Sequence, residues 1–114
     1  MAAEIQQSTV NPNYTTVKLT KRFDATISDE IEGILKHLCE TKKYDIIIDF
    51  KDSNYLSSMG LRVLFSISRI LSEQNKKLNI VNAGSTVLKV IKIADCSSLF
   101  NIYENEEKMA ENIK

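Results

Sequence analysis

The chain has 114 residues, and its 15 acidic and 15 basic side chains give a formal net charge of zero. This length fits one domain with a single modest core, and 43% hydrophobic with 26% charged residues is ordinary for a globular protein. The charge balance argues against a nucleic-acid binder and gives no reason to expect attraction to an anionic membrane.

Apolar side chains at spacings of two, three and four residues predict the order strand, strand, helix, strand, helix, strand, helix, strand, helix. The expected ranges are residues 4–10, 14–20, 28–41, 45–50, 58–75, 78–83, 87–94, 99–103 and 104–114. After an opening hairpin, strands alternate with helices. This alternation predicts an α/β fold, with a mixed, largely parallel sheet of about four to five strands and helices packed against it.

Several side chains have an expected place in these elements. Ser28 is the expected N-cap of the first helix. The consecutive isoleucines at 46–48 indicate a strand that is buried on both faces. Met109 and Ile113 are expected to anchor the terminal helix. In the third helix, the side chains expected to face inward are Val87, Leu88, Val90, Ile91 and Ala94.

The most informative stretch is residues 44–64, where a buried strand leads through a polar loop to Ser57-Ser58-Met59-Gly60 and an apolar helix. A serine at the start of a helix can cap it, worth ~1 kcal/mol, and either Ser57 or Ser58 fits that role. It can also accept a phosphate, whose charge would change what docks there. Gly60 indicates close backbone packing. The helix has so wide an apolar arc, with Leu64 and Phe65 facing the sheet, that another helix or a partner must cover part of it.

Sequence signatures of enzymes are missing. The chain has only three glycines and neither a Gly-x-Gly-x-x-Gly nor a Walker motif. The single histidine, His37, falls on the polar flank of the first helix, where a surface position is favoured over a catalytic base. Asp45, Asp49 and Asp52 surround one strand. They allow a magnesium pocket, but solvated carboxylates at the strand ends are the favoured interpretation. We therefore expect no catalysis, no cofactor and no metal.

The N-terminal residues, the apolar stretches and the two cysteines together indicate where the protein is located in the cell. The first residues show no basic segment followed by an apolar run, so we expect no signal peptide. No apolar stretch approaches the ~20 residues that span a bilayer. Cys39 and Cys96 lie far apart, and buried free thiols are favoured over a disulfide. These patterns predict a cytoplasmic protein.

The junction at residues 57–61 resembles the STAS domain of bacterial anti-sigma factor antagonists. That family has Asp-Ser-Ser/Thr-Gly-Leu after a strand and a short loop. Ser58 falls on the serine that the family phosphorylates, and Gly60 and Leu61 match directly. Ser57 and Met59 stand where the family has Asp and Ser/Thr.

The resemblance covers nearly the whole chain and implies one STAS domain over residues 1–114. Arg22-Phe23-Asp24 resembles the family's loop before the first helix, although the usual glycine is replaced around Lys21. Residues 88–103 resemble the third helix and the turn into the last strand. Asp24 is therefore either a residue of the turn at the start of the helix or a contact for a partner.

The resemblance implies partner switching without catalysis. An anti-sigma factor with serine kinase activity would bind the unmodified domain and then phosphorylate Ser58, which would release it. A PP2C-type phosphatase would reset the switch, with no nucleic acid, cofactor or membrane insertion involved. The residues expected to contact the partner are Asp24, Ser57, Ser58, Met59, Gly60 and Arg62. The alternative is a non-switched STAS module, acting as a scaffold subunit or as the cytoplasmic partner of a transporter.

Overall fold

The computed structural model describes residues 2–9, 11–41 and 44–112. The strands and helices are β1 (Ala3–Gln7), β2 (Tyr14–Leu19), α1 (Ala25–Thr41), β3 (Asp45–Asp49), α2 (Ser58–Ser72), β4 (Leu78–Val81), α3 (Ser85–Ile93), β5 (Phe100–Tyr103) and α4 (Glu106–Asn112). The strands form one sheet in the order β1-β2-β3-β4-β5, with β1 antiparallel to β2 and the other neighbours parallel. The predicted mixed, largely parallel sheet is confirmed.

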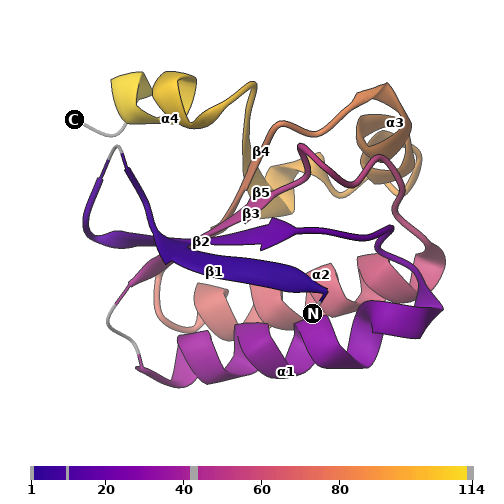
Figure 1. Cartoon of the computed structure of the whole chain (residues 1–114), viewed down its shortest axis with the longest axis horizontal. Coiled ribbons are helices and arrows are strands. Elements are labelled where there is room, and N and C mark those ends of the chain that lie inside the picture. The colour runs from indigo at the N-terminus through magenta and orange to yellow at the C-terminus, as the bar shows by residue number, and fades with distance from the viewer. Residues whose placement is uncertain (1, 10, 42–43, 113–114) are drawn as a thin grey trace.

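The sheet lies between two layers of helices (Figure 1). The three isoleucines of β3 are fully buried, as predicted for a strand covered on both faces. Ile46 and Ile48 join the main core, on the side of α1 and α2. Ile47 faces the other way and packs with Val81 and with Met109 of α4. The predicted anchoring by Met109 is confirmed, whereas Ile113 lies outside the described residues.

α1 begins at Ala25, three residues before the expected start. The Asp24 carboxylate accepts the N–H of Thr26 at 2.9 Å and so binds a donor that the first turn of the helix leaves free. Ser28 is buried inside the helix and donates its hydroxyl to the Ala25 carbonyl at 3.2 Å. The expected cap at Ser28 is wrong, because Asp24 takes that role one turn earlier.

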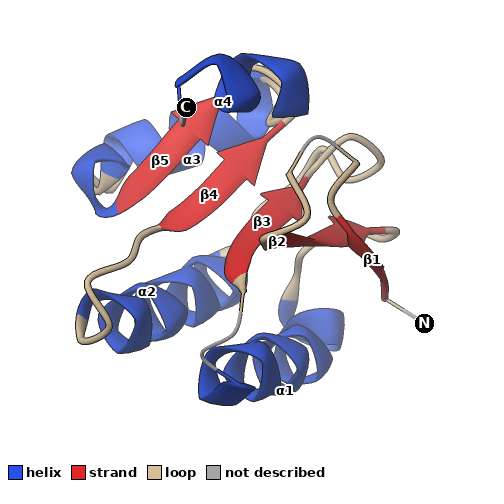
Figure 2. Cartoon of the chain, turned by 90° about the vertical axis from the view of Figure 1, so that its left-hand side faces the viewer, coloured by secondary structure: helices blue, strands red, loops and turns tan. Residues whose placement is uncertain are grey.

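The wide apolar arc of α2 is covered from two sides. Leu64, Ile67 and Leu71 are buried in the main core, and Phe65 is half-buried beside them. α1 lies alongside α2 beneath the sheet (Figures 1 and 2), so a second helix covers the rest of the arc. The helix ends at Ser72, because Asn75 takes a left-handed conformation with φ 61° that reverses the chain.

α3 buries less than its sequence pattern predicts. Val87 and Ile91 are buried, but Leu88 is 38% exposed and Ala94 is exposed. The expectation that Leu88 and Ala94 face inward is wrong, because this helix of nine residues meets the core along only one narrow line. The next strand starts at Phe100, since residues 97–99 form a single turn of 3-10 helix.

Three further expectations concern reactive side chains. Cys39 and Cys96 are free and buried, as favoured from the sequence. Burial raises the pKa of both thiols, which makes them weak nucleophiles. His37 is exposed, as predicted.

Candidate functional site

The start of α2 is capped by Ser57. The backbone of Ser57 is extended, and its hydroxyl oxygen accepts the N–H of Gly60 at 3.1 Å. Ser58 is therefore the first helical residue, and it is exposed. Of the two serines that could cap the helix, Ser57 does so, and the hydroxyl group of Ser58 is left to other chemistry.

Two loops far apart in the sequence join at this point. The N–H of Phe23 donates to the Tyr55 carbonyl at 3.3 Å, and the N–H of Ser57 donates to the Phe23 carbonyl at 2.9 Å. Phe23 and Leu56 thereby form a short parallel bridge. This bridge ties the loop before α1 to the loop before α2. It brings Asp24 close in space to the Ser57–Gly60 segment.

Gly60 permits the close approach of the two loops. A Cβ on Gly60 would lie 2.9 Å from the Phe23 carbonyl oxygen and 2.9 Å from the Leu56 Cδ1 atom. Real Cβ atoms essentially never come so near, so a side chain here would push the helix away from the loop. The close backbone packing predicted from Gly60 is confirmed.

Ser58 is exposed, and the first turn of α2 carries no acidic side chain. Met59 is 38% exposed, and Arg62 is exposed one turn later. Because Ser58 and Arg62 are four residues apart, they lie on the same side of α2. The helix start carries a partial positive charge. An anion attached to Ser58 would thus meet favourable electrostatics from the helix itself.

One contact beside this site has no signal in the sequence. The Arg22 guanidinium carbon lies 4.1 Å from the centre of the Tyr55 ring, a distance typical of a cation–π contact. It adds a second link between the two loops, next to the backbone bridge. No spacing rule connects residues in different loops, so the pair becomes visible only in the fold.

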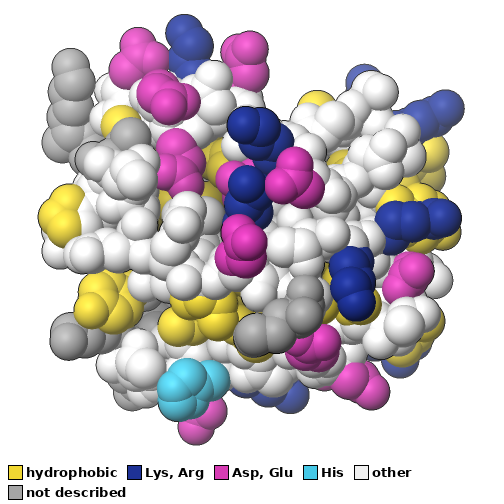
Figure 3. Space-filling model, in the orientation of Figure 1, with side chains coloured by type: hydrophobic (Ala, Val, Ile, Leu, Met, Phe, Trp, Pro, Cys, Tyr) yellow, Lys and Arg dark blue, Asp and Glu magenta, His cyan; other side chains and the backbone are white. Residues whose placement is uncertain are grey.

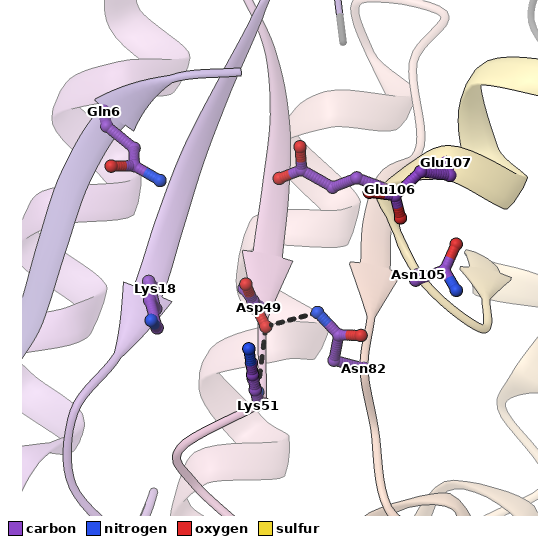
Figure 4. Close-up of a pocket in the computed structure, with 8 residues that line it drawn as sticks. All are labelled: Gln6, Lys18, Asp49, Lys51, Asn82, Asn105, Glu106 and Glu107. Carbon is purple, nitrogen blue, oxygen red and sulfur yellow. Dashed lines mark hydrogen bonds between the residues drawn. The ribbon is translucent and has the colours of Figure 1, made fainter. Parts of the chain in front are cut away.

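Apart from the start of α2, the structure has a polar cavity of about 330 Å³ where β2, β3 and β4 end (Figure 4). It is lined by Gln6, Lys18, Asp49, Lys51, Asn82, Asn105, Glu106 and Glu107. Asp49 is only 9% exposed and accepts the N–H of Lys51 at 2.8 Å and the amide of Asn82 at 2.9 Å. The favoured interpretation of a solvated carboxylate is therefore wrong for Asp49, which orders the loop after β3.

The other two aspartates around β3 have separate partners. Asp52 lies 3.2 Å from Lys18, and its hydrogen bond raises the pKa of that lysine. Asp45 stands at the opposite end of the strand, 3.5 Å from Lys76. The three aspartates do not converge on one point. Within the described ranges, no group of three or more His, Cys, Asp or Glu side chains is arranged to hold a metal ion.

The helices of the described ranges also include none that is long and apolar enough to cross a membrane.

Comparisons with known proteins agree on one family. A family model described as the STAS domain matches residues 5–109. The chain is 21% identical over 101 residues to the anti-sigma-B factor antagonist of Staphylococcus aureus, covering 89% of this chain and 94% of that protein.

Solved structures show the same fold at low sequence identity. An anti-sigma-factor antagonist (STAS) domain protein from Planctomyces limnophilus superposes with a TM-score of 0.84 at 12% identity, covering 100% of this chain and 99% of that chain. The Bacillus cell fate determinant SpoIIAA in its phosphorylated form gives a TM-score of 0.71 at 16% identity, covering 97% and 100%.

Proposed function

Since the chain belongs to the STAS-domain family, we propose that it is an anti-sigma factor antagonist that works by partner switching at the start of α2. The unmodified domain binds an anti-sigma factor with serine kinase activity, and this binding frees a sigma factor. The kinase then phosphorylates Ser58, which releases the domain, and a PP2C-type phosphatase restores the hydroxyl. The observation that carries the proposal is that Ser58 is exposed at the first position of α2, beside a separate capping residue.

Two comparisons support this proposal. The Staphylococcus aureus relative is named for antagonism of an anti-sigma factor, and its match extends over most of both chains. SpoIIAA, which shares the fold, has been solved in a phosphorylated form, so a protein of this architecture tolerates a phosphate. In this chain, Ser58 is the exposed serine at the helix start where such a group meets no acidic neighbour in the first turn.

The physical effect of the phosphate falls on the interface and not on the fold. A phosphoserine carries a charge of about −1.5 to −2 at pH 7, which the start of α2 stabilises through the helix dipole. A partner packed against the neutral hydroxyl would have to strip water from that charge. A desolvation penalty of several kcal/mol weakens binding by orders of magnitude.

The proposed contact residues divide into two groups. Ser58, Met59 and Arg62 are exposed and touch the partner directly. Asp24, Ser57 and Gly60 hold the helix starts and the joined loops in place, and border the contact. Met59, which is 38% exposed, supplies an apolar side chain that a partner would bury.

In this scheme the protein is a ligand and a substrate, and it catalyses nothing. It takes no cofactor and binds no nucleic acid. Its partners place it in the cytoplasm, where sigma factors act. Residues 1–114 act as a single STAS domain, and the matched range 5–109 lies inside it.

The test is incubation of the protein with the candidate anti-sigma kinase and ATP, followed by mass spectrometry of the intact protein and its peptides. We expect one phosphate, on Ser58. Ser57→Ala should still be labelled and Ser58→Ala should not. Phosphate mapped to Ser57, or full labelling of Ser58→Ala, would contradict the proposed site. Binding without any phosphate transfer would favour the non-switched scaffold or transporter module.

A further inference from the structure

β1 forms the outer edge of the sheet, and among the described residues it pairs with β2 alone (Figure 2). At its two ends the N–H of Thr20 donates to the Ala2 carbonyl and the N–H of Ser8 donates to the Tyr14 carbonyl, both at 2.9 Å. In an antiparallel pair, hydrogen-bonded and non-bonded positions alternate. The even-numbered residues of β1 therefore bond to β2, whereas the odd-numbered residues direct their N–H and C=O groups outward.

This edge lacks the features by which proteins protect edge strands. In natural proteins, lysine, proline, a β-bulge or a very short strand prevents an exposed edge strand from pairing with another chain. β1 has five residues in continuous register with β2, contains no lysine or proline, and carries only the charge of Glu4. Ile5 is 47% exposed beside an open hollow of about 630 Å³ that Ala3, Glu4, Ile5 and Thr20 line.

The exposed apolar surface continues from the strand toward a helix. Ile5 lies opposite Val17, which is buried in the main core, so Ile5 is on the face of the sheet that α1 and α2 cover. Figure 3 shows hydrophobic side chains exposed between β1 and α1 on this side of the molecule. The free backbone groups and the apolar side chain thus lie along the same edge.

We propose that a second copy of this chain docks on this edge, with β1 antiparallel to β1 about a two-fold axis at Ile5. In this register Ala3 of one copy faces Gln7 of the other, and Ile5 faces Ile5. All three are outward-directed residues, so every free N–H and C=O group of these residues meets a partner. The two Ile5 side chains cover each other on the helix side of the joined sheet.

Charge selects this register and favours a second copy as the occupant. With the axis at Ile5, Glu4 lies opposite the neutral Gln6, whose amide can donate to the carboxylate. With the axis at Glu4, the two carboxylates would face each other directly, which is destabilising. With the axis at Gln6, fewer outward groups find partners. The strand is therefore complementary to itself in one register.

The assembly closes at two subunits. A two-fold contact uses the same patch on both copies, so no free copy of the patch remains to extend a fibre. The result is one continuous sheet, with both α1 helices on the same side. This inference does not depend on Ser58 or on any kinase.

Sedimentation equilibrium over a series of protein concentrations tests the dimer, and hydrogen exchange measured by NMR tests the register. We expect a monomer–dimer equilibrium. The amides of Ala3, Ile5 and Gln7 should be protected only at high concentration, and those of Glu4 and Gln6 at every concentration. A wild-type chain that remains monomeric throughout overturns the inference, and so does a dimer in which the odd-numbered amides stay unprotected.

Two variants test the contact at Ile5. Ile5→Lys places like charges across the axis, and Ile5→Pro removes one outward N–H without removing a bond to β2. Both should lose the dimer across the same concentration range while circular dichroism reports a folded monomer. Ile93→Lys is the matched control, since Ile93 is 75% exposed on α3, and it should still dimerise. A dimer that survives Ile5→Lys overturns the inference. If Ile5→Pro fails to fold, the lysine variant decides.

Discussion

The carbonyl oxygen of Phe23 lies 2.9 Å from the point where a Cβ on Gly60 would stand. The same oxygen accepts the N–H of Ser57 at 2.9 Å, so it cannot move aside without breaking the bond that joins the two loops. A flexible side chain could give way, but a backbone carbonyl held in this way cannot do so cheaply. The absence of a side chain at Gly60 therefore sets how the surface around Ser58 is presented.

Replacing Gly60 by alanine should destabilise the protein by ~1–3 kcal/mol, because the added methyl group overlaps the Phe23 carbonyl and the Leu56 side chain. Gly33→Ala is the matched control, since a Cβ there meets nothing within 4 Å in the middle of α1. It should stabilise the protein by ~0.5–1 kcal/mol. Urea unfolding of both variants measures the difference. Equal stability of Gly60→Ala and wild type would show that the two loops part easily.

The two serines at the start of α2 should differ in their effect on stability. Ser57→Ala removes the hydroxyl that accepts the Gly60 N–H, and should cost ~1 kcal/mol. Ser58→Ala removes an exposed hydroxyl at the first helical position, and should change stability by less than ~0.5 kcal/mol. Thermal and urea unfolding provide the comparison. If Ser58→Ala cost more than Ser57→Ala, the capping role of Ser57 would be wrong.

Leu64 should be a main contributor to the core from α2. It is fully buried, so Leu64→Ala leaves a cavity and should cost ~2–5 kcal/mol. Ile93→Ala is the control for loss of an aliphatic side chain at an exposed site, and should stay within ~0.5 kcal/mol of wild type. Denaturant unfolding of both variants gives the free energies. A loss below ~1 kcal/mol for Leu64→Ala would mean that the core relaxes around the cavity.

Ser58→Asp and Ser58→Ala should separate binding from folding. Aspartate places a charge in the proposed interface and should weaken binding to the anti-sigma factor at least tenfold, or ~1.4 kcal/mol, whereas alanine should still bind. Both variants should remain folded, and aspartate should raise the free energy of unfolding by a few tenths of a kcal/mol, because its charge interacts favourably with the helix dipole. Calorimetric titration measures both affinities. Equal affinities for the two variants would count strongly against the switch.

Arg62 offers a check that the added charge is what weakens the binding of Ser58→Asp. It lies one turn from Ser58 on the same side of α2, so its charge can partly neutralise an aspartate at position 58. The double variant Ser58→Asp with Arg62→Ala should bind no better than Ser58→Asp alone. Recovery of binding in the double variant would indicate that Arg62, and not the added charge, opposes the partner. The single variant Arg62→Ala is the necessary control.

Local patterns predicted most of the fold correctly, and α3 shows where they fail. The isoleucines of β3 and the periodicity of α2 indicated burial because those elements meet the core over a wide surface. Leu88 continued the same kind of pattern in α3 but is 38% exposed, since a short helix at the edge of the core covers only part of its apolar side. The apolar pattern of a helix does not show how much of its apolar face the core will bury.

By itself, the sequence determined the order of strands and helices and the central strand that is buried on both faces. It also determined the junction at Ser57–Gly60, which resembles the pattern of the STAS family. These depend on residues that are neighbours in the chain. Only the tertiary structure decided that Ser57 is the cap, that Phe23 limits position 60, and that Asp49 is held by Asn82. The physical reason is the same in each case. Capping geometry, steric exclusion and a buried hydrogen bond depend on distances between atoms that the fold, and not the order of residues, brings together.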